Sequence, residues 1–175
     1  MLATTDRRKG EIIDGLVEQL GSRLSGSDAD RAQRFARAYF RDVAPEDLAE
    51  RDPLDLYGAA LAQLRSAQTR QPGEIKLRAY NPRLEQHGWQ STHTVVEIVN
   101  DDMPFLVDSV SAEIARHALN IHLVVHPVLT VRRDASGKLL DVGTADQLPD
   151  GRRESFMLLE VDRQSRPEVL TAPAK

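Results

Sequence analysis

Two adjacent carboxylates are the most suggestive polar residues of this sequence. Asp101 and Asp102 follow Asn100 at the end of an apolar run and precede Met103-Pro104-Phe105, where a helical pattern begins. Side chains of these types could contact the ammonium group of a small ligand, or hold a loop at a subunit interface. The structural alternative is that Asp102 caps the following helix and Asp101 shapes the turn, because a helix N-terminus favours negative charge.

The histidines offer a second possible site. His122 and His126 are four residues apart, a spacing that on a helix would place both rings on one face. They lie instead in a predicted strand, where four residues span about 13 Å. That separation is too large for one metal ion with nitrogen ligands at about 2 Å. We therefore expect histidines on a sheet face and no metal site.

The sequence gives little support for a nucleophilic serine or a nucleotide-binding site. Ser109 and Ser111 lie in a predicted helix near Asp108, without the glycine-flanked strained turn that activates a serine in hydrolases. The chain has no cysteine and neither of the glycine-rich phosphate-binding patterns. We expect no catalytic, cofactor-binding or metal-binding residue in this chain.

The first half of the chain has a helical pattern. Apolar residues recur at three- and four-residue steps from about residue 6 to 70, with a break near Gly26. Ser27 or Asp28 is the expected N-cap of the second helix, and Asp52-Pro53 is a further start signal. These features predict a helical subdomain over residues 1–72.

The second half is rich in Val, Ile and Thr, and Pro72-Gly73 marks the boundary. It forms a predicted α/β unit over residues 73–175, in which Trp89 packs between the two halves. The pairs Arg132-Arg133 and Arg152-Arg153 are expected to be solvated. The predicted elements are strands at 75–80, 92–99, 121–131, 138–142 and 155–161, and a helix at 104–118.

Composition limits the class of protein. The 175 residues include 23 Lys and Arg against 27 Asp and Glu, for a net charge of −4. This balance argues against a nucleic-acid partner, which would favour a basic surplus. No apolar run approaches the roughly 20 residues of a membrane helix, and no signal core follows Met1. We expect a soluble cytoplasmic protein.

One long stretch identifies a family. Asn100-Asp101-Asp102-Met103-Pro104-Phe105-Leu106-Val107-Asp108-Ser109-Val110, followed by residues 119–128 (LNIHLVVHPV), strongly resembles the N-terminal region of the large NAD-specific glutamate dehydrogenases of bacteria. The upstream helices and residues 154–157 are also similar, so the resemblance covers nearly the whole chain.

The resemblance implies an α+β fold of the ACT type. ACT modules have a ferredoxin-like β-α-β-β-α-β antiparallel sheet with helices on one face. The predicted strand 92–99, helix 104–118, and strands 121–131 and 155–161 correspond to its first four elements. The second helix and last strand are expected to be missing, which would leave an exposed sheet edge or face.

The resemblance also implies a function. Such enzymes bind NAD and deaminate L-glutamate to 2-oxoglutarate in a domain far downstream, so this chain would be a non-catalytic regulatory or assembly module without a cofactor. Its partners would be the rest of the parent chain and a second copy, bound through the sheet or helix. The alternative is an amino-acid sensor that binds an effector at Asn100, Asp101 and Asp102. Phe105 stands where many ligand-binding ACT domains have glycine, which argues against the sensor.

Overall fold

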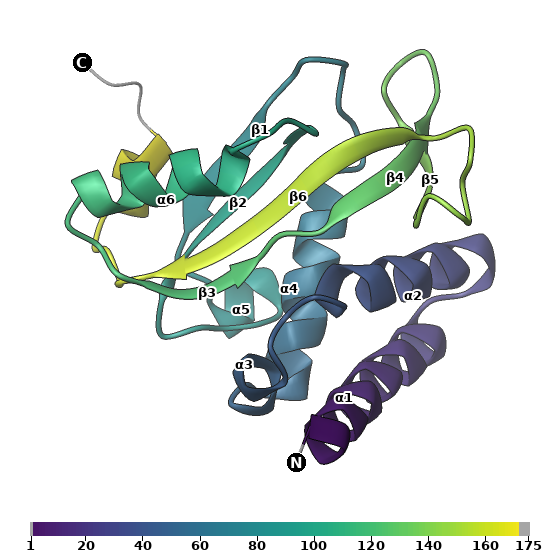
Figure 1. The fold of residues 1–175 in the computed structure, drawn as a ribbon, viewed down its shortest axis with the longest axis horizontal. Coiled ribbons are helices and arrows are strands. Elements are labelled where there is room, and N and C mark those ends of the chain that lie inside the picture. Colours follow the sequence, from purple (N-terminus) through teal and green to yellow (C-terminus); the bar gives the residue numbers. More distant parts are fainter. Residues whose placement is uncertain (1, 172–175) are drawn as a thin grey trace.

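The computed structural model of the chain describes residues 2–171 (Figure 1). Four helices come first, a six-stranded sheet with two inserted helices follows, and a 3-10 helix comes last. The elements are α1 (Leu2–Arg23), α2 (Gly26–Phe40), α3 (Pro45–Ala49), α4 (Pro53–Ser66), β1 (Lys76–Tyr80), α5 (Leu84–His87), β2 (Thr94–Asp101), α6 (Leu106–Arg116), β3 (Ile121–Val125), β4 (Val128–Arg133), β5 (Leu139–Gly143), β6 (Arg152–Val161) and η1 (Pro167–Thr171).

The predicted N-caps of the helices are partly confirmed. Asp52 caps α4 as predicted, since its carboxylate accepts a hydrogen bond of 2.8 Å from the backbone N–H of Leu54. The prediction of Ser27 or Asp28 as the cap of α2 was wrong, because the N-cap is Ser25. Gly26 takes a left-handed φ of 61°, so the chain turns there and enters the helix earlier than the polar residues suggested.

The sheet is antiparallel throughout and has β6 at its centre. Its order is β1-β2-β6-β4-β5, and β3 also pairs with β6. Because β2 occupies one edge of β6, β3 and β4 lie end to end along the other edge. The single strand predicted at 121–131 is therefore interrupted at His126-Pro127, where proline has no N–H to donate to the ladder.

The unit β2-α6-β3 has the split arrangement expected of an ACT-like fold. Both strands run antiparallel to β6, which lies between them, so β2 and β3 are parallel to each other. The edge of β2 that faces away from β6 is covered, because β1 pairs along it from Lys76 to Tyr80. The edge strand on this side of the sheet is therefore β1 rather than β2, and η1 lies against β1.

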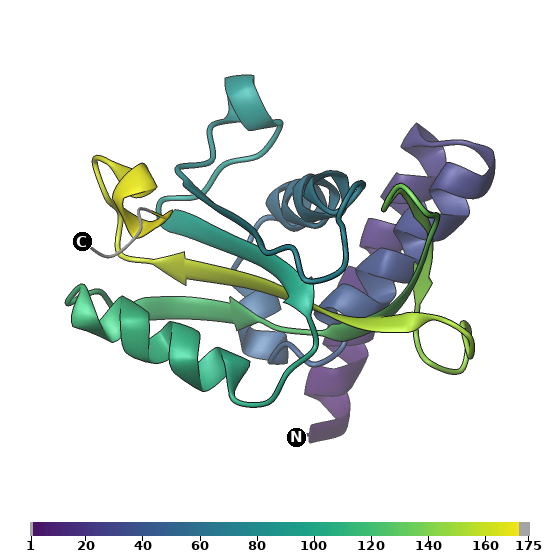
Figure 2. The same ribbon diagram turned by 90° about the horizontal axis from the view of Figure 1, so that it is seen from above.

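Helices cover both faces of the sheet. Figure 2 shows α6 on one face and α4, with the other N-terminal helices, on the opposite face. Alternation along β2 explains the two layers: Val95 and Val99 join a core with the N-terminal helices, while Val96 and Ile98 pack with α6. As predicted, Trp89 is buried between the halves in the first of these cores. Among residues 2–171 no helix is long and apolar enough to cross a bilayer.

Candidate functional site

The predicted Asp pair does not form one site. Asn100 and Asp101 belong to the end of β2, and only Asp102 begins the loop to α6. The carboxylate of Asp101 accepts hydrogen bonds from Arg70 Nη2 at 2.7 Å and from the backbone N–H of Gly73 at 3.0 Å. The Arg70 guanidinium holds the pKa of Asp101 below its ordinary value. Asp101 therefore anchors the turn between the two halves of the chain.

Arg70 belongs to a buried network of charges. It is 1% exposed, and its Nη1 lies 2.8 Å from Glu154 Oε1. Arg133 also binds Glu154, with Nε and Nη2 each at 2.9 Å from a carboxylate oxygen. The expectation that Arg133 is solvated was wrong, because its Nη1 also donates to the carbonyls of Ala67 and Gly137. This network holds α4, β4 and β6 together.

Asp102 does not cap α6, contrary to the structural alternative. Its carboxylate lies 3.1 Å from Arg153 Nη2, and the N-cap position of α6 is Phe105. Asn100 is 3% exposed, and its Oδ1 has no hydrogen-bond partner within the described part of the chain. The carboxylate of Asp101 is thus engaged by the protein, while the amide oxygen of Asn100 is buried without a partner.

Phe105 is held in an unusual conformation. Its φ is 61° and its ψ is 18°, in the left-handed region that costs a bulky residue about 1–3 kcal/mol. The side chain is nevertheless 77% exposed, so it gains little from burial within the chain. The loop before α6 therefore exposes an aromatic ring on an energetically unfavourable backbone conformation.

The histidines have separate partners. His122 Nε2 lies 2.7 Å from Asp162, while His126 Nε2 lies 2.8 Å from the hydroxyl oxygen of Ser155. Burial lowers the pKa of His126, which the negative charge of Asp102 partly opposes. No group of three or more potential ligands for a metal ion converges in the part of the chain that the structure describes.

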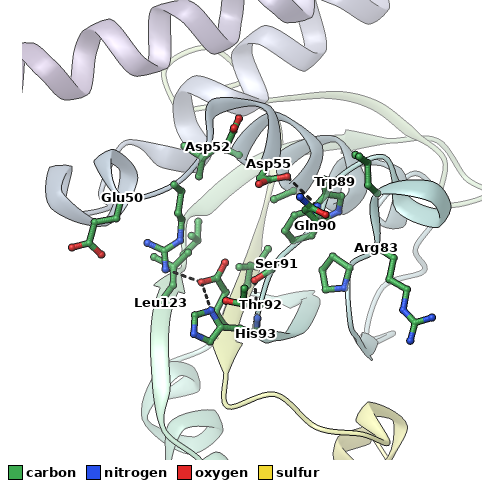
Figure 3. Close-up of a pocket in the computed structure, with 18 of the residues that line it drawn as sticks. Glu50, Asp52, Asp55, Arg83, Trp89, Gln90, Ser91, Thr92, His93 and Leu123 are labelled. Carbon is green, nitrogen blue, oxygen red and sulfur yellow. Dashed lines mark hydrogen bonds and ion pairs between the residues drawn. The ribbon is translucent and has the colours of Figure 1, made fainter.

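A cavity of about 720 Å³, which the sequence did not predict, lies on the helical face of the sheet (Figure 3). It lies between α3, α4, the segment around Trp89–His93 and the sheet. Seven buried apolar residues from widely separated segments contribute to its lining. These apolar residues are Phe40, Leu56, Ala59, Trp89, Leu123, Val125 and Leu158.

Charged side chains converge on the same cavity. Arg51 Nη2 lies 2.7 Å from Glu160 Oε2, and His93 Nδ1 lies 3.4 Å from the same oxygen. Across the cavity, Asp55 accepts a hydrogen bond of 3.0 Å from the backbone N–H of Gln90. Burial raises the pKa of Asp55, as do the charges of Asp52 and Glu160. No local sequence motif predicts this site, because its residues are spread from Tyr39 to Arg163.

Together these features define an ACT-like α+β domain with a helical layer on its second face. The β2-α6-β3 unit and the return of β6 between its strands are the features that carry this assignment. The described residues contain a charge network, an exposed aromatic ring and a cavity.

Comparison with known proteins identifies the family. A family model described as "Glutamate dehydrogenase, ACT1 domain" matches residues 35–174, so the chain belongs to this family. The chain is 41% identical over 162 residues to the NAD-specific glutamate dehydrogenase of Halomonas elongata, covering 91% of this chain and 10% of that protein. It is 36% identical over 172 residues to that of Pseudomonas aeruginosa, covering 98% and 11%.

The chain thus spans about a tenth of the length of the curated relatives that it matches. No solved structure matches it. The turn between β2 and α6 does not fit the pyrophosphate of NAD, because it presents Phe105 where a dinucleotide-binding turn needs glycines for close approach.

Proposed function

We propose that the chain is a non-catalytic regulatory and assembly module of an NAD-dependent glutamate dehydrogenase. The parent enzyme would convert L-glutamate to 2-oxoglutarate with NAD, in a domain that lies outside this chain. Membership of the family supports the proposal, as does the small share of each relative that the chain covers. The proposed compartment is the cytoplasm, and the proposed partners are the rest of the parent chain and a second copy of the module.

The conformation of Phe105 is the observation that carries the assembly role. A left-handed phenylalanine that is 77% exposed is costly in a free module, and the cost is recovered if the ring is buried against another surface. Large apolar residues that stay exposed in one region commonly mark a protein interface.

Other exposed apolar residues lie at the same end of the sheet. Lys76 pairs with Val99, so the start of β1 lies beside the end of β2, from which the loop to α6 leaves. Ile75 is 63% exposed, and Leu77 and Met103 are also exposed. With Phe105 these residues form what we call the Phe105 surface (Ile75, Leu77, Met103 and Phe105). We assign self-association of the module to this surface.

Light scattering on a gel-filtration column tests the assembly role with the 175-residue chain itself. We expect the mean mass to rise above that of one chain as the concentration increases, and a strict monomer at high concentration would contradict the proposal. An NADH assay with glutamate and NAD tests the non-catalytic role. NADH formed by the purified chain would overturn it.

A second candidate function is an amino-acid sensor at Asn100, Asp101 and Asp102. The buried Oδ1 of Asn100, which lacks a partner among the described residues, is the observation in its favour. A ligand ammonium group could supply the missing donor. Millimolar amino acid that raises the melting temperature, with loss of the effect in Asp102→Ala, would support this role.

A further inference from the structure

The cavity beneath α4 has the dimensions of a small-molecule site, and both apolar and charged side chains line it. Sites for small ligands commonly enclose about 300–1,000 Å³, with mostly apolar walls and a few convergent polar groups. This cavity encloses about 720 Å³. It lies on the helical face of the sheet, whereas the loop to α6 leads to a helix on the opposite face (Figure 2). It is therefore separate from the Phe105 surface.

Carboxylates dominate the charge of its lining. The residues around the cavity include five carboxylates and three guanidinium groups. One guanidinium is committed to the protein, because Arg51 donates to the carbonyl of Asp47 at 2.5 Å and to Glu160 at 2.7 Å. A second, Arg163, donates to the carbonyl of Ser91 at 3.2 Å. The lining therefore has more negative than positive side chains, which favours a positively charged ligand.

Two of the carboxylates retain capacity for a ligand. Arg51 and His93 both contact Glu160 Oε2, and Oε1 takes no part in either contact. Asp55 receives one hydrogen bond from Gln90 through Oδ1, which leaves Oδ2 outside that contact. Glu160 is 6% exposed, so a cation that reaches it exchanges water for a charged partner at a buried position.

We propose that this cavity binds a small organic ammonium compound with an apolar group. The ammonium group would be recognised by Asp55 and Glu160, and the apolar group would pack on Trp89 and the sheet residues Leu123 and Leu158. The shared chemistry covers amines and α-amino acids, and an amino acid would also present a carboxylate to Arg83. The inference does not rest on the proposed function, because it concerns a different face and needs no dehydrogenase.

Fluorescence titration of the 175-residue chain provides a direct test. Trp89 is the only tryptophan and lines the cavity, so its emission reports occupancy without a label. The probes are phenethylamine, L-phenylalanine and 3-phenylpropionate, which share an apolar group and differ in charge. We expect saturable changes with phenethylamine, with L-phenylalanine or with both, and none with 3-phenylpropionate. A response to only one of the two ammonium compounds would identify which source of ammonium fits.

The matched variants are Asp55→Asn and Asp146→Asn. Asp146 is exposed in the loop before β6 and does not line the cavity. Loss of the charged contact should weaken binding about tenfold or more in Asp55→Asn and leave Asp146→Asn unchanged. The proposal is overturned if neither ammonium probe binds, if 3-phenylpropionate binds as well as they do, or if Asp55→Asn binds with unchanged affinity.

Discussion

The guanidinium of Arg70 and the carboxylate of Asp101 lie 2.7 Å apart and join the segment after α4 to the end of β2. Arg70 also reaches Glu154 in the central strand, at 2.8 Å. The side chains of Arg70 and Glu154 are 2% and 4% exposed, so the charges are withdrawn from water and depend on one another. This relationship makes Arg70 a buried polar link between the helical half and the sheet.

Replacement of Arg70 by alanine should strongly destabilise the chain. Alanine removes the buried charged hydrogen bonds of Arg70, although Glu154 keeps Arg133 as a partner, so we expect a loss of about 2–3 kcal/mol. Chemical unfolding followed by Trp89 emission measures the change. Arg65→Ala is the control, since Arg65 is an exposed arginine of α4. Equal stability of the two variants would exclude the central role of Arg70.

The pH dependence of stability should include a contribution from Asp101. The Arg70 guanidinium lowers the pKa of Asp101 from its ordinary value of 3.8. The ionised carboxylate therefore stabilises the fold above about pH 4, and this contribution is lost as the pH falls through the lower pKa of the folded state. Since Asp101 is 43% exposed, we expect about 1 kcal/mol. The difference in unfolding free energy between wild type and Asp101→Asn should shrink below pH 4, and a constant difference down to pH 3 would contradict this assignment.

A close approach at Gly58 should make alanine harmful there. A Cβ atom at Gly58 would lie 2.3 Å from the Cβ of Trp89, so the two cannot coexist without movement of α4 or Trp89. We expect Gly58→Ala to lower the unfolding free energy by about 1–3 kcal/mol. Gly15→Ala is the matched control in α1, where nothing lies within 4 Å, and it should stabilise by about 0.5–1 kcal/mol. Similar effects of both substitutions on thermal unfolding would show that Gly58 is not sterically required.

The end of α6 offers a stabilising substitution. Ala118 has a φ of 57°, and Leu119 donates a hydrogen bond to the carbonyl of Ile114 across it, the pattern in which glycine usually occupies the left-handed position. We expect Ala118→Gly to raise the unfolding free energy by about 1 kcal/mol. In contrast, Ala112→Gly within the same helix should lower it by about 1 kcal/mol. A melting temperature that falls in both variants would contradict this interpretation.

Regular elements could be predicted from the sequence because they depend on local patterns. A few neighbouring residues were enough to predict the double alternation in β2, the helical spacing of α6 and the helix start at Asp52-Pro53. The interruption at Pro127 could also have been inferred, since proline cannot donate to a central ladder.

Long-range charge pairing could not be predicted in the same way. Glu154 meets Arg70 across 84 positions of sequence and Arg133 across 21, so only the fold shows that Arg133 is partly buried and paired. The cavity was missed for the same reason, because residues from both halves line it. Exposure of Phe105 likewise depends on the whole fold, although its place in the loop was known.

Sedimentation velocity over a range of concentrations tests the central claim most directly, with wild type, Phe105→Gly and Leu140→Ala compared. Glycine suits the left-handed conformation, so Phe105→Gly should fold normally, which circular dichroism can verify. Leu140 is an exposed leucine on β5, at the far edge of the sheet from β1, and is the matched apolar control. We predict concentration-dependent association in wild type and Leu140→Ala, weakened about tenfold or more in Phe105→Gly. A monomeric wild type, or equal association of all three proteins, would contradict the assembly role of the Phe105 surface.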